Sequence, residues 1–117
     1  ALFTVQPAID TGVLEPPPVG VGSVLLLTEL LTKPVRFGHL DEATELRALL
    51  QRLQLIPVTS AIADMSIVLG AKYELRAVDA VHLATAVDAG ADRFITNNSK
   101  DFARSIEEID ITYPSEL

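Results

Sequence analysis

Two carboxylates of this chain stand in segments that are otherwise almost wholly apolar. Glu29 lies in the run Val-Leu-Leu-Leu-Thr-Glu-Leu-Leu of residues 24–31, and Asp79 lies in the run Ala-Val-Asp-Ala-Val-His-Leu-Ala of residues 77–84. Burying an ionised carboxylate without a partner costs several kcal/mol, so each side chain needs a compensating group. For Glu29 two interpretations stay open: it pairs with an Arg or reaches solvent, or its otherwise buried helix aims it into a polar pocket that holds a cation.

Asp79 and His82 are three residues apart, which places them on one face of a helix. Asp79 falls in the first turn, where a carboxylate complements the helix dipole without any functional role. A lone His on an apolar helix is most simply a hydrogen-bonded core residue. The chemical alternative is that both side chains support a shared site with Glu29.

A third group of polar side chains follows the short apolar segment Phe94-Ile95. The cluster runs Thr96-Asn97-Asn98-Ser99-Lys100-Asp101. Turn chemistry alone explains such a composition. It also stands at the carboxyl end of an expected strand, where the sites of parallel sheets form. Carboxylate, amide and hydroxyl oxygens without any Cys suit Mg²⁺ or Mn²⁺, ions that activate water and bind phosphate oxygens.

Four cationic side chains fall in expected loops or helix starts close to these groups. They are Lys33, Arg36, Arg76 and Lys100. Each could contact the phosphates of a nucleic acid, and each is equally well explained as an ordinary solvated charge.

Short apolar segments alternate with longer helical patterns along the chain. Strands are expected at residues 19–22, 55–58, 94–96 and 109–113. Helices are expected at 24–32, with Pro34 as terminator, and from His39 or Asp41 onward. Further helices are expected from a Ser60 cap, with Gly70 as a potential break, at 77–89 before Gly90, and briefly at 101–104. This alternation predicts an α/β fold of three layers, α/β/α, with a short, mainly parallel sheet flanked by helices.

Length and composition limit the classes of protein that remain. The chain has 117 residues, no Cys and a formal net charge of -7. One domain over residues 1–117 is expected, without disulfides and without an apolar stretch of the ~18 residues that span a membrane. The acidic balance disfavours nucleic-acid binding by charge alone, although a metal ion can neutralise the phosphate instead. A cytoplasmic location is the default expectation.

These segments, in this order, resemble a PIN-domain ribonuclease of the kind found as VapC-type toxins in toxin–antitoxin pairs. The strongest match is LRAVDAVHLATA at residues 75–86, followed by GAD at 90–92 and FITN at 94–97. Residues 23–30 resemble the family's second strand and following helix, with Glu29 at the acidic position. The resemblance covers residues from about Val19 to Tyr113.

The resemblance implies a fold, an activity and a set of roles. PIN domains gather acidic residues around one or two Mg²⁺ or Mn²⁺ ions, and a metal-bound water cleaves RNA. Glu29 and Asp79 match two of these acids, and Asn98 stands where a further acid is common. Asp101 is expected to compensate for the missing charge. Supporting roles fall to the remaining polar residues of these segments, which are Thr96, Asn97 and His82.

The front of the chain departs from the family pattern. The family begins with a central strand that ends in an Asp, and the nearest candidate here is Asp10, only 19 positions before Glu29. That spacing is too short for the family's helical hairpin, and Pro7 would interrupt a buried strand. We therefore expect residues 2–9 to form a short helix ending at Gly12, and the first strand with its Asp to be missing from this sequence.

Two further functional classes compete with a metal-dependent endoribonuclease. The first is a catalytically impaired PIN-like module that binds a protein, which Asn98 and the missing first Asp favour. The second is an unrelated parallel α/β domain of the response-receiver type. The resemblance also implies an antitoxin partner and a homodimer, while the substrate RNA and its cleavage position cannot be read from the sequence.

Overall fold

The computed structural model describes residues 2–5, 20–96, 98, 100–103 and 105–116. Within these residues the chain forms one sheet in the order β3-β2-β1-β4-β5. The strands are β1 (Leu2–Val5), β2 (Val21–Ser23), β3 (Gln54–Ile56), β4 (Arg93–Thr96) and β5 (Asp110–Thr112). The helices are α1 (Leu25–Arg36), α2 (Leu40–Leu50), α3 (Ser60–Tyr73) and α4 (Ala77–Asp88), with a short 3-10 helix at Pro114–Glu116.

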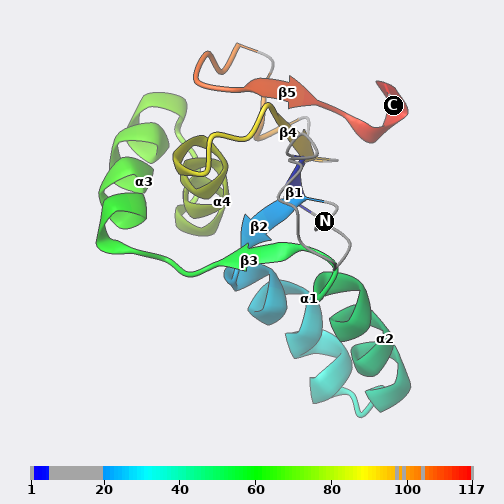
Figure 1. Cartoon of the computed structure of the whole chain (residues 1–117). Coiled ribbons are helices and arrows are strands. Elements are labelled where there is room, and N and C mark those ends of the chain that lie inside the picture. Colours follow the sequence, from blue (N-terminus) through cyan, green and yellow to red (C-terminus); the bar gives the residue numbers. More distant parts are fainter. Residues whose placement is uncertain (1, 6–19, 97, 99, 104, 117) are drawn as a thin grey trace, which may run out of the picture.

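The sheet is parallel except at its centre. Strand β2 runs parallel to β3, and β4 runs parallel to β5. Strand β1 lies between β2 and β4 and is antiparallel to both. The predicted α/β fold, with a short, mainly parallel sheet flanked by helices, is therefore confirmed (Figure 1).

The prediction of a short helix from Leu2 is wrong, because Leu2–Val5 is strand β1. Its four residues pair one to one with β4, from Leu2 opposite Thr96 to Val5 opposite Arg93. Pairing with β4 over all four residues, and with β2 at Thr4, stabilises the extended backbone, and Phe, Thr and Val suit a strand. Asp10, the expected helix end at Gly12 and the proline connector lie outside the described residues.

Pro34 does not terminate α1, as was predicted, but lies within its last turn. Proline there removes only the bond to the carbonyl of Leu30, and its ring is buried. The helix ends instead at Arg36, and Gly38, with a φ of +70°, then turns the chain away from the helical path.

Other predicted boundaries need small corrections. Thr59, rather than Ser60, caps α3, since its hydroxyl accepts a hydrogen bond from the Ile62 backbone N–H at 3.2 Å. Gly70 does not interrupt α3; a Cβ there would lie 3.3 Å from Cβ of Ala80, so glycine permits close packing of α3 on α4. The described part of the predicted helix at 101–104 is a turn and a bend.

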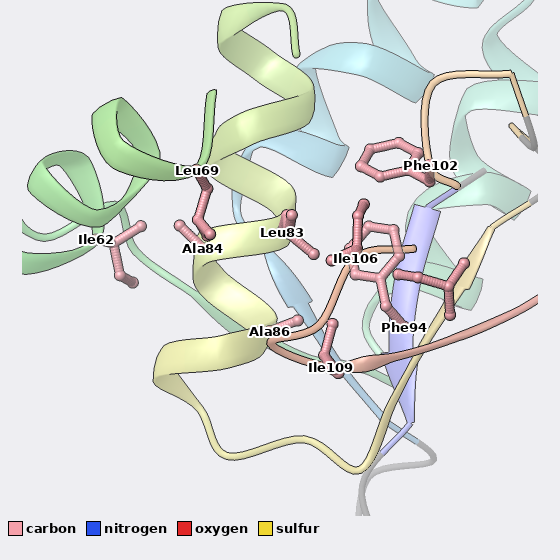
Figure 2. Packing of buried hydrophobic residues seen from close by; sticks show 10 residues of the cluster. Ile62, Leu69, Leu83, Ala84, Ala86, Phe94, Phe102, Ile106 and Ile109 are labelled. Carbon is pink, nitrogen blue, oxygen red and sulfur yellow. The ribbon is translucent and has the colours of Figure 1, made fainter. Parts of the chain in front are cut away.

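The larger core cluster joins α3 and α4 to the β4–β5 half of the sheet. Figure 2 shows Ile62 and Leu69 of α3 beside Ala84 of α4, and Leu83 of α4 pointing toward Ile106 and Phe94. The rings of Phe94 and Phe102 lie 4.9 Å apart between centroids. A second cluster of Leu26, Leu31 and Leu50 holds α1 against α2. No helix in the described ranges is long and apolar enough to cross a membrane.

Candidate functional site

Helix α4 supplies the buried polar side chains of the site. Asp79 and His82 are both buried, amid Ala80, Leu83 and Ala84 of the same helix. The small side chain of Ala80 lies where α4 packs closely on Gly70 of α3. Arg76 precedes the helix with extended backbone (φ -66°, ψ 157°), and its side chain makes no capping bond.

Glu29 and His82 form a direct link between α1 and α4. Oε1 of Glu29 is in hydrogen-bond contact with Nε2 of His82. The His82 side chain is only 2 % exposed, whereas that of Glu29 is 38 % exposed. The expectation that α1 is a buried helix is therefore wrong, because only Leu26, Leu31 and Pro34 of it are buried, and Glu29 agrees with the interpretation that it reaches solvent. Glu29 lies at the rim of the site, and its partner is a His rather than an Arg.

Asp79 and Asp101 share one guanidinium group. Nε of Arg76 lies 3.4 Å from Oδ2 of Asp79, and a terminal nitrogen of Arg76 lies 3.4 Å from Oδ2 of Asp101. The side chain of Asp79 is 9 % exposed and that of Arg76 is 79 % exposed. The structure thus brings together two acidic residues that stand 22 positions apart in the sequence, and it places a cation between them.

Asn98 fixes the loop that carries Asp101. Its Oδ1 accepts from the Asp101 backbone N–H at 3.2 Å, and its Nδ2 donates to Oδ2 of Asp101 at 2.8 Å. Its own backbone N–H donates to the hydroxyl of Thr96, which is fully buried at the carboxyl end of β4, at 3.0 Å. These bonds orient the Asp101 carboxylate toward Arg76. Asn97 lies outside the described residues.

The four predicted cations do not share one location. Arg76 contacts the site carboxylates, and Lys100 is exposed in the turn next to Asp101. Lys33 and Arg36 belong to the last turn of α1, where Arg36 lines a groove of about 570 Å³ between α1 and α2. Sequence reasoning missed that Arg76 pairs with acidic groups, although its spacing of three residues from Asp79 is a signal for an ion pair.

The side chains of the site carry the kind of oxygen donor that binds divalent ions, but few of these donors lie close together. Across the described ranges, no group of three or more His, Cys, Asp or Glu side chains is placed to hold a metal ion. Asp79 and Asp101 nevertheless both pair with one positive charge, the guanidinium of Arg76. Oxygen donors of this kind are those that Mg²⁺ and Mn²⁺ prefer.

Comparisons with known proteins identify the family. The fold matches a solved structure described as a toxin-antitoxin complex from Klebsiella pneumoniae, with 28% sequence identity and a TM-score of 0.70. That match covers 88% of this chain and 79% of the other. No curated protein matches the chain. The PIN domain family matches residues 8–106, most of the sequence, and the chain therefore belongs to the PIN-domain family.

Proposed function

We propose that this chain is a metal-dependent endoribonuclease of the PIN type and the toxin of a toxin–antitoxin pair. The observation that carries the proposal is the convergence of Asp79 and Asp101 on one cation at the carboxyl edge of β4. When bound, Mg²⁺ or Mn²⁺ supplies an activated water and a positive charge beside the phosphate.

Each site residue has a role in this proposal. Asp79 is the buried carboxylate that holds the ion, and Asp101 is the second, oriented by Asn98. Glu29, positioned by His82, supplies the third acidic side chain at the rim. Thr96 anchors the loop through its hydroxyl. Ligand roles for Glu29 and Asn98 stay predictions, since their contacts here are with His82 and Asp101.

RNA would approach from the exposed side of the site. Arg76 and Lys100 are exposed beside Asp101 and are the nearest proposed phosphate contacts. Lys33 and Arg36 would extend this path along α1. Because the net charge is -7, the few cations near the site must hold the backbone, and we expect binding to weaken with added salt.

The proposal includes an antitoxin as protein partner, a homodimer and a cytoplasmic location. The toxin-antitoxin neighbour supports the first of these, at 28% identity over most of both chains. Exposed apolar side chains on α1 and α2, among them Val35, Leu40 and Leu49, supply surface that a protein partner would cover.

Loss of the site carboxylates tests the proposal directly. Asp79→Asn and Glu29→Gln should each lower Mn²⁺-dependent cleavage of a fluorescent single-stranded RNA by about 100-fold or more, because each removes a charged oxygen donor. Asp64→Asn, on an exposed position of α3, is the matched control and should cut like the parent. Circular dichroism checks that each variant is folded. Equal cleavage by the parent and both site variants would refute the proposal.

The centre of the sheet favours a second candidate, a PIN-like module that has lost catalysis and binds a protein. Strand β1 has the sequence Leu-Phe-Thr-Val, carries no carboxylate and runs antiparallel to its neighbours. The family pattern places an Asp-bearing strand at the centre of the sheet, where this chain has β1. This candidate predicts that Mn²⁺ leaves the melting temperature unchanged, that RNA stays intact, and that a protein partner still binds.

A further inference from the structure

Arg76 is the cation that the two site carboxylates already share. Within the described part of the chain, the ion pairs of Asp79 and Asp101 are both with this one residue, each at 3.4 Å. A buried carboxylate such as Asp79 needs a compensating positive charge, and Arg76 supplies it from the same end of α4.

The two sides of this contact differ sharply in burial. The Asp79 side chain is 9 % exposed and fixed by α4, while the Arg76 side chain is 79 % exposed. The other carboxylate, Asp101, makes two hydrogen bonds with Asn98 that do not involve Arg76. Ion pairs between exposed groups are weak and lose little when water replaces one partner. Arg76 can therefore leave when another cation takes over the neutralisation of the buried Asp79 carboxylate.

We propose that Arg76 is an exchangeable internal cation of the metal site. Its guanidinium neutralises Asp79 and Asp101 until a divalent ion binds between them, and the like charge of that ion then displaces Arg76 toward solvent and the RNA phosphate. This inference rests on the proposed function in one respect, since the divalent ion is the Mg²⁺ or Mn²⁺ of that proposal. Arg76 thus competes with the metal ion for the two carboxylates, and after its displacement it contacts the RNA phosphate.

Mn²⁺ binding to the full chain, measured by calorimetry, tests this competition. Arg76→Gln should bind Mn²⁺ about three- to ten-fold more tightly than the parent, because one or two weak ion pairs no longer compete. Arg76→Lys should fall between the two, since a Lys ammonium lacks the fork that reaches both carboxylates. Arg52→Gln removes the same charge from an exposed position after α2 and should bind Mn²⁺ as the parent does.

Thermal melting supplies a second measurement. Without metal, Arg76→Gln should melt below the parent because Asp79 loses its counter-charge, and saturating Mn²⁺ should raise its melting temperature more than that of the parent. Unchanged or weaker Mn²⁺ affinity in folded Arg76→Gln overturns the inference. Absence of Mn²⁺ binding in the parent and in all variants overturns it as well.

Cleavage of RNA separates this inference from the proposed function. Tighter Mn²⁺ binding by Arg76→Gln with no RNA cleavage by the parent would support the inference and refute the nuclease. Cleavage by the parent with no gain in affinity for Arg76→Gln would support the nuclease and refute the inference.

Discussion

Helix α4 and the hairpin formed by α1 and α2 all carry apolar residues, but α4 is far more deeply buried than α2. Seven of the twelve residues of α4 are buried, including three polar ones, Asp79, His82 and Thr85. Of the eleven residues of α2, only Leu50 is buried. Figure 1 shows the hairpin extending away from the sheet, whereas α4 lies against α3 and the strands.

The difference comes from side-chain size and neighbours. Helix α4 carries Ala at close contacts and is enclosed by α3, β2 and the β4–β5 half of the sheet. The hairpin buries a small cluster and leaves Leu40 and Leu49 largely exposed. A site that takes Asp79 from the first region and Glu29 from the second therefore joins a rigid element to a weakly held one. The contact of Glu29 with His82 is the link between them.

The largest expected effect is on stability in the α4 core. Leu83→Ala removes a fully buried side chain and should lower the free energy of unfolding by about 2–5 kcal/mol. Leu49→Ala, at a position 58% exposed, should change it by less than about 0.5 kcal/mol. Urea unfolding of the two variants measures the contrast. Equal losses at both positions would mean that the hairpin is as firmly packed as α4.

A smaller effect is expected at the link between the regions. Glu29→Ala removes the partner of His82 and should cost about 1 kcal/mol of unfolding free energy, because it leaves a buried ring nitrogen without its hydrogen bond. Glu45→Ala, which removes an exposed carboxylate from α2, is the control and should have little effect. Hydrogen exchange should show faster opening of α1 in Glu29→Ala. If α1 exchanges at the parent's rate in that variant, the contact does not hold the hairpin.

The smallest expected effect concerns Glu108 and depends on pH. The Tyr73 hydroxyl and the Lys72 ammonium both bond Glu108, and together they hold the pKa of that carboxyl below its ordinary 4.5. Because the folded pKa is lowered, this contribution is complete above pH 4.5 and is lost as the pH falls through the lowered value. Glu108→Gln should therefore melt about 1–4 °C below the parent at pH 7.

As the pH falls through this lowered pKa, the two melting temperatures should converge, since the parent's Glu108 then also loses its charge. Scanning calorimetry across this range measures the difference. A gap between the two proteins that is constant with pH would show that the charge of Glu108 contributes nothing.

The sequence predicted the elements whose signals are local. The pattern around Asp79, with Gly90 after it, gave α4 nearly to its ends, and Gly90 does adopt a φ of +68°. Strand β4 was also correctly placed, apart from its first residue, Arg93. Strand β1 was missed because its conformation depends on pairing with residues near the other end of the chain, which no local pattern contains.

The sequence predicted which residues belong to the candidate site better than it predicted how they are arranged. Residue types suggested that Glu29, Asp79 and His82 belong together, and the Glu29–His82 contact joins two of them. That Arg76 binds Asp79 and Asp101, however, depends on where the loop after β4 returns relative to α4. Such a path is set by tertiary packing, and a sequence pattern does not encode it.

The place of β1 in the sheet bears on how the chain folds. Its residues are made before every other element here, yet they pair with β4, one of the last. During synthesis β1 must wait until the β4 segment has left the ribosome, and closing so long a loop is slow. Until then, β2 and β4 lack the neighbour between them, and their open edges can pair with another chain. Expression temperature and chaperone supply should therefore affect the yield of this protein more than single surface substitutions do.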